Sequence, residues 1–184
     1  MTATEVLKEE HRVIERMLAV METAAQRLEA GQPVRPGLLR EAVEFVRNFA
    51  DKNHHGKEEA NLFPRLEERG VPKEGGPLGM MLHEHDQGRA FIQGIDGAID
   101  GYENGDDAAA QVIIENMRGF IQLLTEHIWK EENVLFQMAD QVLTEDDQKD
   151  LSERFERVDA EVLGPEEFKR YVDLVGRAEQ ELGA

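Results

Sequence analysis

Two ten-residue segments of this chain repeat one another, and they constrain its fold more than any other feature. Residues 54–63 read HHGKEEANLF and residues 127–136 read HIWKEENVLF, so six of the ten positions are identical. A Glu-His pair precedes each segment, with its histidine at His11 or His85, 43 and 42 residues before the first histidine of the segment. The chain therefore contains two copies of one unit, and each copy offers a histidine followed by a His-x-x-x-Glu pair.

The surrounding sequence predicts helices. Apolar residues recur at steps of three and four, and strand-like alternation is absent. Four amphipathic helices are expected, from a cap at Thr4 to about residue 30, from 36 to the region of 64–70, from 77 to 103, and from 107 to 141. The fourth stripe continues past Glu131 to Val134 and Met138. Because the connections are short, the pattern predicts an all-α fold, an antiparallel four-helix bundle.

The C-terminal region carries further helix signals. Thr144 and Asp147 form a capping pattern for a fifth helix that ends near residue 162, and Gly164-Pro165 opens a sixth. We expect the bundle to occupy residues 1–143 and a C-terminal helical extension, residues 144–184, to pack on it. No motif in this extension predicts a role.

Composition excludes several classes of function. The chain has no cysteine, which removes disulfides, thiolate nucleophiles and Cys-ligated metal clusters. Its formal charge is −18, from 21 basic and 39 acidic residues, so nucleic acid and anionic membranes are poor partners. Neither a long apolar span nor a signal peptide is visible, and the expected location is the cytoplasm. A monomer or a homodimer is expected.

The repeat predicts a metal site. Residues four apart on a helix share one face, so the histidine and glutamate of each pair can reach the same ion. One metal rarely takes six side-chain ligands of this kind, whereas two metals bridged by both carboxylates use all six. Nitrogen and oxygen donors without thiolate suit iron or manganese. Without metal, burying these groups would cost several kcal/mol for each unpaired charge. The predicted ligands are His11, His54, Glu58, His85, His127 and Glu131.

Over roughly residues 5–140 this pattern resembles the hemerythrin-like (HHE cation-binding) family, in which Glu-Glu-x-x-Leu-Phe is also typical. The resemblance implies an antiparallel four-helix bundle with two Fe ions, an oxo- or hydroxo-bridged di-iron centre. It also implies that the four histidines are terminal ligands and that Glu58 and Glu131 bridge the irons. Oxygen carriers of the family have a further histidine on the third helix. Met81 stands at that position here, and His83 points elsewhere, which puts reversible oxygen carriage in doubt.

Four functions follow as alternatives. The first is binding or sensing of O₂ or a related diatomic ligand. The second is a redox enzyme that decomposes peroxide or reduces nitric oxide in stress or iron homeostasis. Ferritin-like iron oxidation is disfavoured, because those sites use Glu-x-x-His and more carboxylates. A purely structural metal site is the fourth. Beside the ligands, His55, Glu59 and Glu132 are either partners that orient the imidazoles or surface groups.

Overall fold

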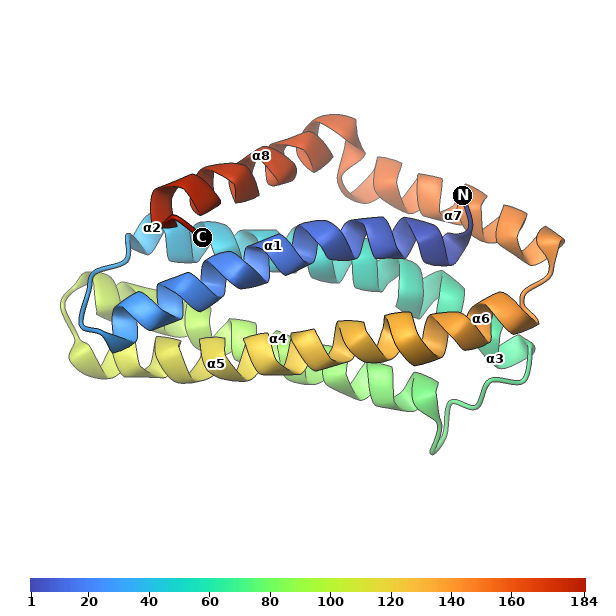
Figure 1. Cartoon of the computed structure of the whole chain (residues 1–184), viewed down its shortest axis with the longest axis horizontal. Helices are drawn as coiled ribbons and strands as arrows, with labels where there is room; N and C mark the ends of the chain where they lie inside the picture. The colour runs from blue at the N-terminus through green and yellow to red at the C-terminus, as the bar shows by residue number, and fades with distance from the viewer.

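The structure, a computed structural model, describes all 184 residues and contains helices and no strands. Long helices lie side by side in a bundle (Figure 1). The bundle has four of them, and two change between α and π geometry along their length. The bundle consists of α1 (Ala3–Glu29), α2 (Pro36–Phe45) continuing through η1 (Val46–His55), η2 (Glu58–Leu62) and α3 (Phe63–Glu68), α4 (Pro77–Glu103), and α5 (Asp107–Lys130) continuing through η3 (Glu131–Leu135) and α6 (Phe136–Val142). The all-α bundle predicted from the sequence is confirmed.

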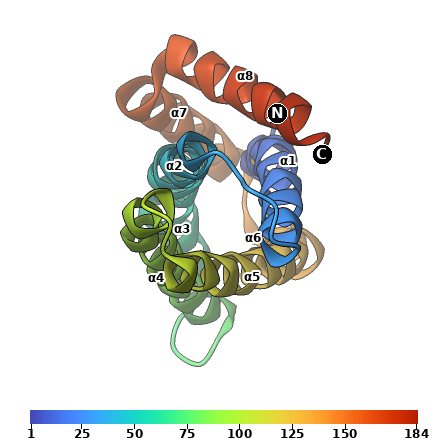
Figure 2. The same ribbon diagram turned by 90° about the vertical axis from the view of Figure 1, so that its left-hand side faces the viewer.

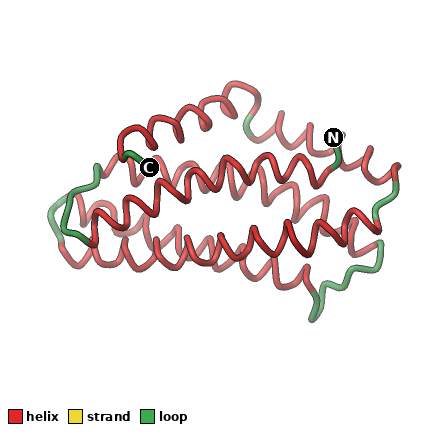
Figure 3. Tube along the Cα trace, in the orientation of Figure 1, coloured by secondary structure: helices red, strands yellow, loops and turns green.

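Successive helices run in opposite directions and are joined by short loops at the two ends of the bundle (Figure 3). The C-terminal helices α7 (Glu145–Val162) and α8 (Gly164–Leu182) form a second layer. Seen along the bundle, they lie over α1 and α2 and leave the α4 and α5 side uncovered (Figure 2). No helix combines the length and apolar character needed to cross a membrane.

Local signals explain where the helices begin. Thr144 caps α7 with a complete capping box, because its hydroxyl accepts from the Asp147 N–H while the Asp147 carboxylate accepts from the Thr144 N–H. The same motif begins α1, but its cap is Thr2, paired with Glu5, rather than the expected Thr4. Thr4 lies inside the helix, where its hydroxyl donates to Asp140.

Three π-helical segments distinguish the second and fourth bundle helices from ordinary α-helices: η1 and η2 in the second and η3 in the fourth. The N–H of Phe63 donates to the carbonyl of Glu58, and the N–H of Phe136 donates to the carbonyl of Glu131. Each bond spans five residues, which is the π-helical pattern often found at functional sites. The extra residue in the turn shifts the inward face. The expectation that Val134 points inward was therefore wrong: it is 45% exposed, and Leu135 is buried in its place.

The core is divided into two apolar clusters. The larger cluster, of 32 buried residues, fills the half of the bundle around Met21, Phe45 and Ile113. The smaller cluster, of 13 residues, fills the other end around Leu7, Leu66 and Phe136. Both clusters include residues of the C-terminal helices, such as Tyr171 in the first and Phe155 in the second. Buried polar residues lie in the layer between the two clusters, and this layer holds the candidate site.

Candidate metal centre

All six residues predicted as ligands come together inside the bundle, and each is at most 2% exposed. Every long helix contributes to this polar layer. The donors are His11 on α1, His54 on η1, Glu58 at the start of η2, His85 on α4, His127 on α5 and Glu131 at the start of η3. A seventh residue, His55 on η1, is also buried beside them.

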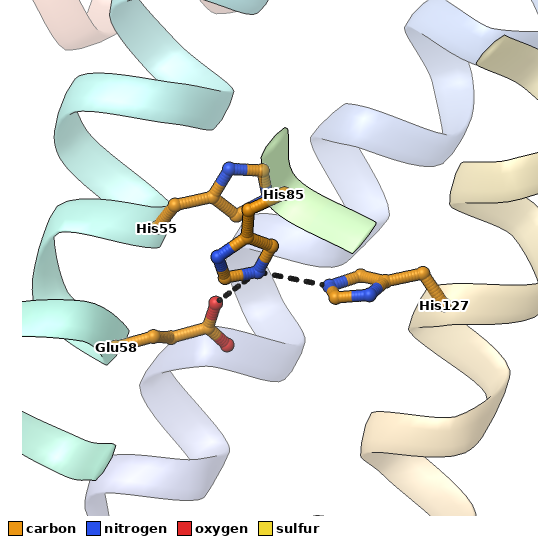
Figure 4. A group of neighbouring side chains, drawn as sticks. All are labelled: His55, Glu58, His85 and His127. Atoms are coloured by element: carbon orange, nitrogen blue, oxygen red, sulfur yellow. Dashed lines mark hydrogen bonds and ion pairs between the residues drawn. The ribbon is translucent and has the colours of Figure 1, made fainter. Parts of the chain in front are cut away.

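The donors form two overlapping groups. Within each group the ligand atoms lie within 4.8 Å of one another. One group is drawn in Figure 4 and comprises His55, Glu58, His85 and His127; the other comprises His11, His54, Glu58 and Glu131. Because Glu58 belongs to both groups, the two candidate positions for an ion are adjacent and share a carboxylate.

Each carboxylate faces imidazoles from both groups. One oxygen of Glu131 lies 3.2 Å from His11 Nε2 and the other lies 3.2 Å from His127 Nε2. The oxygens of Glu58 lie 3.6 Å from His54 Nε2 and 3.5 Å from His85 Nε2. Two donors that bind one transition-metal ion at about 2.1 Å are separated by about 3.0–3.6 Å for bond angles of about 90–120°. The spacing therefore fits two carboxylates that each join two ions.

The imidazoles of His85 and His127 face each other through their Nε2 atoms. The Nε2 atoms of His85 and His127 are 3.1 Å apart. The Nδ1 atom of His85 contacts Glu59 at 2.7 Å, and that of His127 contacts Glu84 at 2.9 Å. A neutral imidazole that donates from Nδ1 has a lone pair at Nε2. Two lone pairs directed at one point make a poor hydrogen bond but a good pair of metal donors.

Every imidazole of the centre has a carboxylate on its Nδ1 atom. Metal-bound histidines regularly have such a partner, which fixes the tautomer and the orientation of the ring. The pairs are His11 with Glu132 at 3.0 Å, His54 with Glu10 at 2.9 Å, His55 with Asp51 at 3.3 Å, His85 with Glu59 and His127 with Glu84. The structure thus assigns Glu59 and Glu132 as partners that orient imidazoles, one of the two roles considered from the sequence.

Lysine and arginine side chains in turn bind the outer carboxylates, which are the carboxylates that contact the imidazole Nδ1 atoms. Lys57 donates to Glu10 and Lys130 donates to Glu84, at matching positions of the repeat. Two arginines complete the arrangement: Arg12 donates to Glu132 at 2.7 Å and Arg89 donates to Glu59 at 2.6 Å. The matched residues of the two ten-residue segments therefore supply four of the six predicted donors, together with the two lysines and the carboxylates Glu59 and Glu132 that support them.

Burial and mutual repulsion set the protonation of the inner carboxylates. Burial and the charge of Glu131 raise the pKa of Glu58 well above its ordinary value. Burial also acts to raise the pKa of Glu131, but the facing His127 and His11 outweigh it and lower this pKa. Burial lowers the pKa of His54. It acts in the same direction on His127, where Glu131 and Glu84 prevail and raise the pKa to about 9. Bound cations would replace these protons.

The orphaned atoms of the centre test whether a metal fits. All four oxygens of Glu58 and Glu131, together with His11 Nε2, are buried and have no hydrogen-bond partner. Native proteins rarely leave buried polar atoms unsatisfied, and an unpaired buried charge is costly. These atoms belong to the residues that the spacing argument selects as metal donors. The two buried His/Glu groups are thus consistent with a binuclear metal site.

From the sequence, His55 was either a partner that orients the imidazoles or a surface group, and the structure instead buries it among the donors themselves. In an ordinary α-helix, adjacent residues point in directions about 100° apart. The π-helical segment η1 has wider turns, and both His54 and His55 are buried. The sequence does contain an indication of these wider turns. The inward positions of this helix recur at 46, 50, 54, 58 and 62, all in steps of four. Such a stripe drifts around an α-helix but stays on one face when the turns widen.

A pocket of about 380 Å³ connects this side of the centre with the surface. It opens between η1 and α4 and reaches His55 and His85. Its lining combines apolar and charged side chains. The lining includes Val46, Ile92, Phe120 and Leu124, and Arg47, Asp51, Lys52 and Arg89. The volume falls within the range of sites that hold small molecules.

Comparisons with known proteins agree with this geometry. The profile of the hemerythrin HHE cation binding domain matches residues 2–139, which span the bundle and all seven residues described above. An uncharacterized protein of Mycobacterium bovis and two of Mycobacterium tuberculosis are each 28% identical over 182 residues. These alignments cover 99% of this chain and 71% of each relative. No solved structure matches the chain.

The domain profile covers most of the chain, and the layer of buried histidines and glutamates lies within the matched residues. The fold agrees with the resemblance drawn from the repeat, since four antiparallel helices surround the two donor groups. On this basis the chain belongs to the hemerythrin HHE cation binding domain family.

Proposed function

We propose that this chain is a non-haem di-iron protein that binds or senses O₂ or a related diatomic or redox ligand. Its ligands are the four histidines His11, His54, His85 and His127 and the bridging carboxylates Glu58 and Glu131. In this proposal the iron pair supplies electrons and open coordination positions, and the protein supplies donors, orientation and a route from solvent.

One observation carries the proposal. The four oxygens of Glu58 and Glu131 are buried without hydrogen-bond partners, and each faces an imidazole Nε2 at 3.2–3.6 Å. A protein that used these groups only for packing would leave two adjacent carboxylates desolvated, at a cost of several kcal/mol. A pair of divalent cations removes that cost because it neutralises both carboxylates and gives each of their four oxygens a partner.

The chemistry of the donor set favours iron. Imidazole and carboxylate donors without thiolate are typical of iron and manganese, and the chain has no cysteine. Structural zinc sites take four ligands around one ion. Here the two donor groups are contiguous through Glu58, which is an arrangement for two ions.

The pocket that reaches His55 and His85 favours an exogenous ligand over a purely structural role for the metal. At about 380 Å³ it is larger than a diatomic molecule needs. The same observation supports a second candidate function, a di-iron redox enzyme that decomposes peroxide or reduces nitric oxide. The two candidates differ in the fate of the ligand. A binding or sensing protein releases the ligand chemically unchanged, whereas an enzyme converts it to a product.

The first experiment is the metal content and visible spectrum of the purified protein. We expect two irons per chain and an absorption band of the bridged pair that disappears on reduction. Exposure of the reduced protein to O₂, H₂O₂ or nitric oxide then identifies the ligand. Reversible return of the starting spectrum supports binding or sensing, whereas continuous consumption of the added ligand supports the enzyme. Absence of iron and of any spectral response would refute the di-iron proposal.

Two variants test the ligand set. His54→Ala and Glu131→Ala are expected to lose most of the iron, because each removes a donor that nothing nearby replaces. His83→Ala is the matched control, since His83 is exposed on α4 two residues before His85. It should retain two irons. Full iron content in either of the first two variants would refute the assignment of that residue.

A further inference from the structure

We propose that His55 is a fifth imidazole ligand of the metal pair, and that the pocket behind it gives small molecules direct access to its coordination position. The proposal rests on the metal pair of the proposed function. One ion would then be held by three imidazoles, His55, His85 and His127, and the other by two, His11 and His54.

The geometry of His55 matches that of the other imidazoles. Its ligand atom lies within 4.8 Å of those of Glu58, His85 and His127. Its ring stacks on that of His85, with centroids 3.8 Å apart and an interplanar angle of 16° (Figure 4). Its Nδ1 atom contacts Asp51 at 3.3 Å, which leaves Nε2 as the donor atom. His83, the histidine outside the centre, is exposed and has no such carboxylate partner.

The carboxylates that contact His55 and His85 share one arginine, Arg89. Arg89 donates to Asp51 at 2.9 Å and to Glu59 at 2.6 Å. These carboxylates are the Nδ1 partners of His55 and His85. A single guanidinium therefore fixes the partners of both rings. A histidine that only filled space would not need a carboxylate partner tied to that of a neighbouring donor.

The position of His55 explains why the third helix can lack a histidine four residues before His85. Met81 occupies that place and is buried in the smaller apolar cluster. The π-helical segment instead directs a second residue of η1 toward the centre. The other half of the repeat has no equivalent, because the residue matching His55 there is Ile128, which packs in the larger cluster. Only one of the two ions can gain the extra imidazole.

The pocket distinguishes His55 from His11, His54 and His127, none of which lines it. His55 and His85 are the two inner donors that line it. His55 comes from the helix at the pocket wall, and its neighbours there include Val46 and Ile92. Removal of the ring would leave a space that is continuous with the pocket and shaped for an imidazole. A small neutral donor added from solvent should be able to occupy that space.

The test is chemical rescue in the Co²⁺-loaded protein, in which the visible spectrum reports the number of ligands. His55→Ala should keep both ions but weaken the binding of one by at least about tenfold, since even outer partners of metal ligands are worth 10–100-fold. Its spectrum should change, and added imidazole should restore the wild-type spectrum. His54→Ala is the matched control. His54 is equally buried but does not line the pocket, so imidazole should not restore its Co²⁺ binding.

A second variant guards against simple misfolding. His55→Gln keeps most of the side-chain volume, and its helical content and thermal midpoint without metal should match those of the wild type. Its Co²⁺ spectrum should nevertheless change. If His55→Ala and His55→Gln both keep the wild-type spectrum and affinities, His55 is a packing residue and the inference is wrong. If His55→Ala changes the spectrum and imidazole has no effect, access through the pocket is refuted.

The wild-type titration separates this inference from the proposed function. If the wild-type protein takes up no pair of metal ions, the proposed function fails before His55 is examined. If it binds two ions and His55→Ala behaves like the wild type, the metal pair stands and only the fifth ligand is refuted.

Discussion

The two halves of the repeat each offer two histidines and one glutamate as predicted donors, but they sit in different surroundings. In the first half, Lys57 is fully buried, and it donates to Glu10 and, at 2.5 Å, to Asp159 of α7. In the second half, Lys130 is 26% exposed and has Glu84 as its carboxylate partner. The C-terminal helices cover the first half and leave the second half open (Figure 2). Duplication therefore accounts for the donors, and later elements account for the difference between the halves.

This difference assigns support of the donors and access from solvent to different sides of the centre. The predicted ligand His54 is supported by a continuous chain of contacts that runs through Glu10 and Lys57 to Asp159 of the C-terminal layer. The group that contains His55 and His85 faces the pocket. We therefore expect the side of the centre at His54 to retain a bound metal and the side at His55 and His85 to give small molecules access to it. The following predictions test that division, beginning with the largest expected effect.

Removal of the C-terminal layer should damage the first half of the bundle most. The rings of Phe45 and Phe49 are buried and contact Tyr171, and Phe49 also contacts Phe168. A chain that ends at residue 143 would expose both phenylalanines, at about 1.5–3 kcal/mol each. The thermal midpoint should fall by roughly 10–20 °C, measured by circular dichroism. A truncated chain with the wild-type midpoint and metal content would show that the layer is dispensable.

The inner carboxylates Glu58 and Glu131 should behave alike in metal binding but differently in the metal-free protein. Glu58→Gln and Glu131→Gln each keep the side-chain volume but remove a charged bridge, so both variants should lose the metal pair. Without metal, Glu58→Gln should be at least as stable as the wild type, because burial and Glu131 raise the pKa of Glu58 and already favour its neutral form. Glu131→Gln should be less stable than the wild type, because it removes the carboxylate that faces His11 and His127. Metal content and denaturant unfolding of the metal-free proteins measure the two effects. If one variant keeps two ions, that carboxylate does not bridge them.

The two lysines should behave differently. Lys57→Met leaves Glu10 buried without its cation, and breaking a buried ion pair costs about 3–5 kcal/mol. Lys130→Met removes a partly exposed pair, which is worth about 0–1 kcal/mol. Urea unfolding of the metal-free proteins gives both free energies of unfolding. Equal losses would refute the distinction between a sealed and an open half.

Much of this arrangement could be predicted from the sequence, for a physical reason. Helical periodicity and the steps of four between histidine and glutamate are local, so the bundle and the convergence of six donors followed from residues such as His54 and Glu58. The π-helical turns could not be predicted by assuming α geometry throughout. They rotate Val134 outward and bring His55 inward. The sequence did contain one indication of them, the inward positions of the second helix that recur in unbroken steps of four.

Contacts between distant elements were beyond reach of the sequence. Lys57 and Asp159 are 102 residues apart, and neither lies in a pattern that names the other. The role of the C-terminal extension could therefore not be predicted before its position on α1 and α2 was known. The outer carboxylates Glu10 and Glu84 were visible as part of the repeat, but their assignment to His54 and His127 required the packing of neighbouring helices.

Asp159→Asn should have the smallest effect of the series, and it tests whether the C-terminal layer supports the metal as well as the fold. Asp159 is 41% exposed, so loss of its charge should cost about 1 kcal/mol or less. Its partner Lys57 is fully buried and also holds Glu10, the Nδ1 partner of His54. A looser Lys57 would let Glu10 and the His54 ring move. Loss of metal to a chelator should therefore become several-fold faster, with little change in thermal midpoint.

The double variant with Lys57→Met separates this route from a general loosening of α7. If Asp159 acts through Lys57, adding Asp159→Asn to Lys57→Met should leave the rate of metal loss as it is in Lys57→Met alone. Contacts in one network are coupled in this way, whereas independent effects add. Additive rates would mean that Asp159 affects the metal by another path. The double variant therefore decides whether the sealed half is one continuous support from α7 to the metal.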